Sequence, residues 1–175
     1  MEGLSYPIGR FERPQSLGPS EREAALATLA RAPADLRRVI ERLDAQQLDT
    51  PYRPAGWTVR QVVHHLPDSH MNAYIRFRLA LTEDGPAVKV YDEARWAELA
   101  DARLGRPEAS LSLLAALHER WVALLRSIDE QKWERVYRHP ELGDVRLDVA
   151  LAMYDWHSRH HLAHITHLCE REGWV

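Results

Sequence analysis

The histidines near the end of the chain have the spacing of metal ligands. The 175-residue sequence contains ten histidines, and five of them lie in one short stretch: His157, His160, His161, His164 and His167. His157 and His161 are four residues apart, so in a helix their imidazoles lie one turn apart on the same side and can bind one ion. Neutral imidazole is a good ligand for zinc, nickel and ferrous ions. This pair predicts a divalent-metal site.

The third ligand is expected on a different helix. His164 lies about 10 Å along the helix axis from His157, whereas metal–nitrogen distances are about 2 Å. A second histidine cluster supplies the alternatives His64, His65 and His70. Helical periodicity favours His70, which lies on the apolar side of its segment, whereas His65 lies on a polar side that could line a cleft. The residue pattern alone leaves this choice open.

A structural role for these histidines competes with metal binding. A histidine on an apolar helix face usually packs in the core and is satisfied by a hydrogen bond. However, each buried polar ring costs about 1–3 kcal/mol when it is left unpaired, and a metal would satisfy two rings at once. Three imidazoles on the core-facing stripe of one helix, His157, His161 and His164, therefore favour metal binding. His160 and His167 lie toward the edge of that stripe and are expected to play supporting or surface roles.

Four long amphipathic segments are expected to position the histidines. Apolar residues recur every three or four positions in these segments, which are residues 21–43, 58–81, 110–128 and 148–172. Capping boxes formed by Ser20 with Glu23 and by Thr58 with Gln61 predict the starts of the first two helices. Gly173 predicts the end of the last. The economical architecture is an all-α four-helix bundle.

The connecting segments suggest smaller elements within a single domain spanning residues 1–175. Residues 1–19 are rich in proline and glycine and are expected to form an extended N-terminal arm. Residues 92–104 predict one short helix, and a small hairpin is expected where residues 135–138 and 145–147 flank a turn. Pro33 is expected to kink its helix or split it in two, and Pro67 is expected to cause a bend or a local irregularity in its helix.

Composition argues against several functional classes. The net charge is −3 and the basic residues are scattered, so there is no basic stripe for nucleic acid. No apolar run approaches the roughly 20 residues of a membrane-spanning helix, and residues 1–14 lack a signal-peptide pattern. The single cysteine, Cys169, cannot form an internal disulfide, which fits a reducing compartment. We therefore expect a cytoplasmic protein that acts on a small molecule.

Four segments carry a resemblance to a known family. They are residues 6–11 (YPIGRF), 56–66 (GWTVRQVVHHL), 68–77 (DSHMNAYIRF) and 156–165 (WHSRHHLAHI). Together they resemble the YfiT branch of the DinB family, which comprises metal-dependent hydrolases and related bacillithiol S-transferases. The resemblance spans nearly the whole chain. It implies a four-helix bundle, a cytoplasmic homodimer and one divalent metal, zinc first and nickel as the alternative.

The resemblance also implies which histidines bind the metal. It places the ligands at the second histidine of the His-His-Leu motif and at the two histidines that follow the tryptophan, which here are His65, His157 and His161. The family pattern therefore selects His65 over His70. The sequence departs from the pattern at Pro67, where relatives usually have a good helix former, and at Ser158, where they often have glycine.

Three neutral protein ligands leave one position open, as in catalytic zinc sites. A dication lowers the pKa of a thiol or a water molecule that binds there. A small thiol such as bacillithiol could then attack an electrophile, which would make the protein an S-transferase. The alternative is a hydrolase, which usually needs a carboxylate as general base. Ser158 and Arg159 occupy the positions between the paired histidines where an HExxH motif has its glutamate, and this absence favours thiol transfer.

Other side chains are candidates for a role beside the metal. Asp68 is one turn beyond His65 and could act as a base, although a solvated surface aspartate is the more ordinary interpretation. Arg76 and Tyr154 are near the predicted ligands in helix geometry and could orient a substrate. A non-catalytic, metal-binding dimeric bundle is the remaining alternative to an enzyme.

Overall fold

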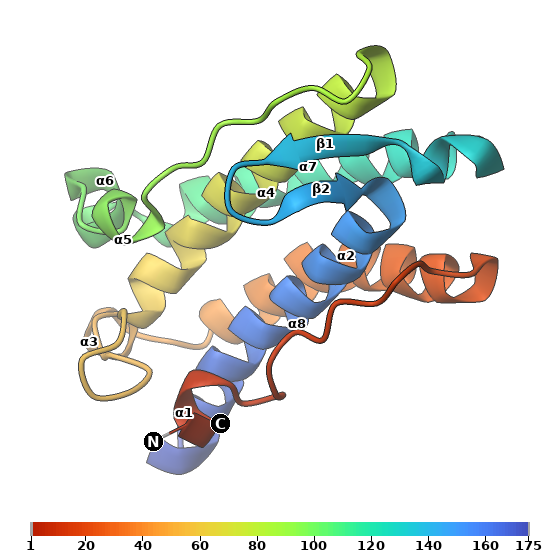
Figure 1. Ribbon diagram of the computed structural model, residues 1–175. Helices are drawn as coiled ribbons and strands as arrows, with labels where there is room; N and C mark the ends of the chain where they lie inside the picture. The colour runs from red at the N-terminus through yellow and green to blue at the C-terminus, as the bar shows by residue number, and fades with distance from the viewer. Residues whose placement is uncertain (1, 175) are drawn as a thin grey trace.

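Four long helices form the framework of the computed structural model, which describes residues 2–174 (Figure 1). They are α2 (Pro19–Ile40), α4 (Val59–Thr82), α7 (Pro107–Arg126) and α8 (Leu147–Glu172). Helix α2 packs against α7 and α8, and α4 packs against the same two helices from the other side. The predicted four-helix bundle is confirmed. None of the helices in residues 2–174 is long and apolar enough to cross a membrane.

The start of α4 follows the predicted capping box. The Thr58 hydroxyl accepts a hydrogen bond of 3.2 Å from the backbone N–H of Gln61, and the Gln61 side-chain oxygen accepts one of 2.9 Å from the backbone N–H of Thr58. The predicted end of α8 is also confirmed, because Gly173 adopts the left-handed conformation with φ of 68°. Glycine is favoured there because it has no Cβ to clash.

Helices α2 and α7 begin slightly earlier than predicted, at Pro19 and Pro107. Proline suits a first helical position because the N–H that it lacks would have no partner there. The predicted capping box at Ser20 is wrong. Instead, the Glu21 carboxylate accepts a hydrogen bond of 2.7 Å from the backbone N–H of Gly18.

The two internal prolines do not divide their helices. Helix α2 continues through Pro33 and α4 continues through Pro67, so the alternative of a split at Pro33 is wrong. Each proline removes one backbone hydrogen bond from its helix. Both prolines are buried in the bundle.

Short elements connect the long helices, and two of them correct the predictions. The N-terminal arm is not extended throughout, because it begins with a helical turn. The single helix predicted over residues 92–104 is two short helices separated by a turn. The short helices are α1 (Glu2–Ser5), α3 (Ala45–Leu48), α5 (Glu93–Trp96), α6 (Ala100–Leu104) and the 3-10 helix η1 (Glu130–Glu134).

The predicted hairpin is present between η1 and α8. Strand β1 (Val136–His139) pairs antiparallel with β2 (Gly143–Arg146), and His139 lies opposite Gly143 at the turn end. Tyr137 and Val145 are opposite each other and are buried. The hairpin therefore lies against the bundle through its apolar side.

A layer of histidines separates two apolar clusters in the bundle. One cluster includes Phe77 of α4, Trp121 of α7 and Leu151 of α8. The other includes Val62 of α4 and Ile165 of α8. His70 of α4 and His157, His160 and His161 of α8 fall between the residues of the two clusters, so rings from these helices meet in the middle of the bundle.

Candidate metal centre

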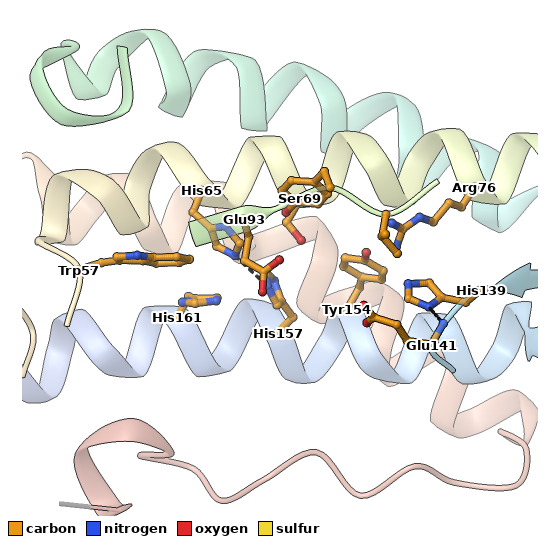
Figure 2. Close-up of a pocket in the computed structure, with 12 residues that line it drawn as sticks. Trp57, His65, Ser69, Arg76, Glu93, His139, Glu141, Tyr154, His157 and His161 are labelled. Carbon is orange, nitrogen blue, oxygen red and sulfur yellow. Dashed lines mark hydrogen bonds between the residues drawn. The ribbon is translucent and has the colours of Figure 1, made fainter. Parts of the chain in front are cut away.

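Helices α4 and α8 bring the three predicted ligands together. His65, His157 and His161 each offer a ring nitrogen, and these nitrogens all lie within 4.8 Å of one another. The Nε2 atoms of His65 and His157 are 3.3 Å apart. Two nitrogens on one tetrahedral zinc, at about 2.0–2.1 Å from it, lie about 3.4 Å apart. Figure 2 shows the three rings converging from the two helices. The spacing therefore fits a single ion.

The three rings are in the protonation state that a metal requires. Burial lowers the pKa of His65 to about 4. Burial and the neighbouring imidazoles lower the pKa values of His157 and His161 well below the ordinary value of 6.5. At neutral pH the group therefore consists of uncharged imidazoles, each with one nitrogen lone pair available for coordination.

A pocket of about 430 Å³ opens beside the three histidines. The ring of Trp57 packs against His65, with centroids 4.8 Å apart, and forms one end of it. Arg76 and Tyr154 also line the pocket, and Figure 2 shows Arg76 at the other end. The donor set of three nitrogens with an accessible fourth side fits a divalent ion that can exchange a ligand.

A second group of histidines shares one member with the first. His160, His161 and His164 also have ring nitrogens within 4.8 Å of one another. Of these three, only His161 lines the pocket. The His164 Nε2 atom is 3.1 Å from the backbone carbonyl of Ser5, to which it donates a hydrogen bond. The first group is therefore the better candidate for an ion that meets a substrate.

The other histidines of α4 lie outside the candidate site. The ring of His64 contacts the Ser110 hydroxyl at 2.7 Å and the Gly105 carbonyl at 3.2 Å, so it points toward α7 and the end of α6. His70 is fully buried behind the site. Its Nε2 atom is 3.0 Å from Nδ1 of His157. His70 thus contacts a candidate ligand on the side away from the pocket.

Two of the three candidate catalytic residues line the pocket. Arg76 donates a hydrogen bond of 3.1 Å to the Lys89 carbonyl, which fixes its side chain along the pocket wall. Burial raises the pKa of the Tyr154 phenol, so this group remains a neutral donor. Asp68 is not among the lining residues. Its burial, together with the nearby carboxylate of Asp101, raises its pKa to about 6.

A carboxylate in the pocket was missed by the sequence analysis. Glu93 of α5 lines the pocket together with the three histidines, and Figure 2 shows its side chain extending into the cavity. Asp92 caps α5 by accepting a hydrogen bond of 2.9 Å from the backbone N–H of Arg95. The buried Gln61 side chain of α4 donates to the Ala97 carbonyl at 2.8 Å. These contacts hold α5 over the site.

The hairpin contributes a further wall that sequence spacing did not suggest. His139 and Glu141 line the pocket on the side of Arg76. Burial and the nearby Arg76 guanidinium lower the pKa of His139. The only available signal was the turn between the two strands, which predicts a hairpin but not the surface against which it packs.

Fold and site together define a class of protein: a four-helix bundle with three histidines grouped on the wall of a pocket. The sequence matches the DinB superfamily over residues 28–165, and the chain belongs to this superfamily.

Close relatives carry names that refer to a metal. The protein named "Putative metal-dependent hydrolase YfiT" from Bacillus subtilis strain 168 is 50% identical over 172 residues, covering 98% of this chain and 97% of the relative. A solved structure of YfiT from Bacillus subtilis, described as "a probable metal-dependent hydrolase with an unusual four-helix bundle topology", has a TM-score of 0.96 at 49% identity and covers 99% of both chains. These names support a metal-dependent enzyme.

A more distant structural neighbour has the same fold. It is a mycothiol-dependent maleylpyruvate isomerase with a TM-score of 0.63 and 18% identity, and the match covers 79% of this chain and 60% of the isomerase. At this level of identity the likeness shows the fold alone.

Proposed function

We propose that this protein is a metal-dependent S-transferase that joins a small thiol, such as bacillithiol, to an electrophilic substrate. His65, His157 and His161 would hold one divalent ion, zinc or nickel. The observation that carries the proposal is the convergence of three neutral imidazoles on the wall of a 430 Å³ pocket, with their fourth side accessible. When bound, the ion would lower the pKa of a thiol that reaches this side.

The pocket residues have roles that suit this reaction. Glu93 can accept the proton of the thiol and pass it to solvent, because its side chain is exposed at the pocket. The Arg76 guanidinium can bind a carboxylate of the thiol or of the electrophile, as arginine does through paired N–H groups. The neutral Tyr154 phenol can donate a hydrogen bond to the electrophile. The pocket lies in the size range of small-molecule sites.

The distant fold neighbour supports a thiol as the co-substrate. That protein is described as dependent on mycothiol, which is a small thiol. The argument from it is one of fold analogy, since a shared fold hosts different chemistries.

Hydrolysis is the second candidate, and a specific observation favours it. The absence of a glutamate between His157 and His161 argued against a hydrolase, but Glu93 brings a carboxylate to the same pocket from α5. A carboxylate in this place can act as general base toward water. The names of the close relatives point in the same direction.

One assay separates the two reactions. Zinc-loaded protein is incubated with 1-chloro-2,4-dinitrobenzene, with and without bacillithiol or cysteine as the probe thiol. In the transferase reaction the thiol sulfur forms a bond to the aryl carbon, chloride leaves with the bonding electron pair, and the thiol proton goes to solvent. We expect the zinc-loaded protein to accelerate thioether formation above the rate of thiol and electrophile without protein, and to form no dinitrophenol when the thiol is absent. Formation of dinitrophenol in water alone would instead establish hydrolysis.

Matched variants connect the activity to the site. His161→Ala removes a proposed ligand and should abolish thioether formation together with zinc binding. His167→Ala is the control, because His167 lies on the same helix but is exposed. Equal activity of both variants would show that the reaction does not use the three-histidine group.

A further inference from the structure

A chain of hydrogen-bonded histidines runs from the candidate site into the core of the bundle. Behind His157, the His70 Nε2 atom lies 3.0 Å from Nδ1 of the ligand. The other nitrogen of His70 is 2.7 Å from Nε2 of His118 on α7. Finally, Nδ1 of His118 is 2.6 Å from the backbone carbonyl of Leu29 on α2. The chain of hydrogen bonds thus links all four long helices of the bundle, α8, α4, α7 and α2.

Pro33 explains why the chain ends at Leu29. In an α-helix the carbonyl of residue 29 would accept a hydrogen bond from the N–H of residue 33. Proline has no N–H, so the helix leaves the Leu29 carbonyl without its usual donor. The ring of His118 supplies the missing hydrogen. A proline that weakens α2 locally therefore creates an acceptor that points at the histidines.

The carbonyl sets the direction of every hydrogen bond in the chain. A carbonyl oxygen can only accept, so His118 must carry its hydrogen on Nδ1, and its Nε2 must be a bare acceptor. His70 must then donate from Nδ1, which leaves its own Nε2 bare. His157 must in turn donate from Nδ1. The remaining nitrogen, Nε2 of His157, is the atom that lies 3.3 Å from His65 in the candidate metal site.

We propose that His118 and His70 are positioning residues that lock His157 in the Nδ1–H tautomer, so that its bare Nε2 faces the metal. The inference rests on the proposed function only in that His157 is a metal ligand, and it is independent of whether the enzyme transfers a thiol or hydrolyses its substrate. Outer hydrogen bonds of this kind fix the tautomer and ring orientation of metal-binding histidines.

Burial keeps the rings of His70 and His118 neutral. Together with His157 they form a relay of hydrogen bonds that all run in one direction. His70 is 0% and His118 is 2% exposed. Desolvation lowers the pKa of His118 to about 4 and that of His70 well below its ordinary value. When the rings are neutral, each hydrogen bond among His157, His70 and His118 contains one hydrogen. No two donor nitrogens therefore face each other.

The tautomer can be measured directly in the metal-free, full-length protein. Long-range proton–nitrogen NMR correlation distinguishes a protonated Nδ1 from a protonated Nε2 in each assigned histidine. We expect His157, His70 and His118 all to be Nδ1–H tautomers. A wild-type His157 protonated on Nε2 would overturn the proposal. This measurement requires neither bound metal nor enzyme activity.

Two variants of His118 test the consequence for metal binding. His118→Leu removes the acceptor for His70, and we expect zinc affinity to fall about 10- to 100-fold with a mixture of His157 tautomers. His118→Gln should restore much of both, since its side-chain oxygen can accept from His70 while its N–H₂ donates to Leu29. Unchanged affinity and tautomer in a folded His118→Leu protein would contradict the relay.

A matched control separates the relay from general stability and from the metal site itself. His64→Leu also removes a buried, hydrogen-bonded histidine, but one outside the relay. It should lower thermal stability without changing zinc affinity. Failure of the wild-type protein to bind one equivalent of zinc would refute the metal site, whereas normal binding that His118→Leu leaves intact would refute the relay alone.

Discussion

His157 and His161 lie one turn apart on α8, yet different parts of the molecule hold them. His157 contacts His70, a fully buried ring whose support continues through His118 to the core helix α2. His161 has a longer contact of 3.4 Å between its Nδ1 atom and that of His164. His164 in turn donates to the carbonyl of Ser5 in the N-terminal helix α1, which lies beside the end of α8 (Figure 1).

The supports of His157 and His161 are anchored to different parts of the molecule. The inner support, His70 and His118, connects long helices that pack against each other in the bundle. The outer support, His164 and Ser5, depends on a short arm at the surface. Core helices are the last parts of a protein to open, whereas chain ends open readily. The arrangement therefore pairs a rigidly held proposed ligand, His157, with a more adjustable one, His161, on the same helix.

Removing a proposed ligand should have the largest effect on zinc affinity, and the loss should be the same for His157 and His161. His157→Ala and His161→Ala each leave two imidazoles, and we expect at least a 100-fold loss of zinc affinity, more than outer partners cause. Competition with a chromophoric chelator measures it. His65→Ala should cause a similar loss of zinc affinity. If His70→Ala removed the metal and His65→Ala did not, the ligand assignment would be wrong.

Acid should destabilise the metal-free protein, because the buried ring of His118 in the inner support resists protonation. The pKa of His118 is about 4 when folded and near 6.5 when unfolded. Below pH 6.5 the unfolded chain takes up a proton that the folded protein does not, so the free energy of unfolding falls as the pH drops toward 4. Above pH 6.5 the contribution is fully present. For His118 alone this amounts to about 3 kcal/mol.

Chemical denaturation of the metal-free protein between pH 7.5 and 4.5 measures this slope. His118→Gln should flatten it, since glutamine does not titrate. An equal slope in wild type and His118→Gln would show that the inner ring does not govern acid stability.

His70 contacts the proposed ligand His157 directly, so replacing it tests the inner support one step closer to the candidate metal site. His70→Leu leaves Nδ1 of His157 and Nε2 of His118 without partners. We expect zinc affinity to fall about 10- to 100-fold and the free energy of unfolding to fall by about 1–3 kcal/mol. Zinc competition and thermal unfolding measure the two effects. A variant that is less stable but binds zinc normally would show that His70 serves the core only.

The contrast between His65 and His70 also shows where sequence reasoning succeeds. Periodicity correctly placed His70 on the core side of α4, and it is fully buried there. A metal that meets a substrate must face a pocket, however, and the pocket side of α4 carries His65 and Ser69. An amphipathic pattern identifies the side of a helix that packs, so it selected His70 of the inner support and not the proposed ligand His65. Family resemblance supplied the distinction.

Other parts of the site depended on contacts that a local pattern does not encode. The four helices, the hairpin and the caps at Thr58 and Gly173 follow from periodicity and capping rules. Glu93 reaches the pocket only because Gln61 holds the following segment over α4. Pro33 suggested a broken helix, whereas the structure uses its missing N–H to anchor a histidine.

The smallest effect is expected from the outer support. His164→Phe keeps an aromatic ring where His164 stacks on Tyr52 with centroids 3.9 Å apart, but removes the contacts to His161 and Ser5. Because the 3.4 Å contact is longer than a well-formed hydrogen bond, zinc affinity should fall less than about 10-fold. His167→Phe is the control on the exposed side of α8. A loss as large as that of His70→Leu would mean that the arm holds His161 as firmly as the core holds His157, and the proposed asymmetry between the ligands would then be wrong.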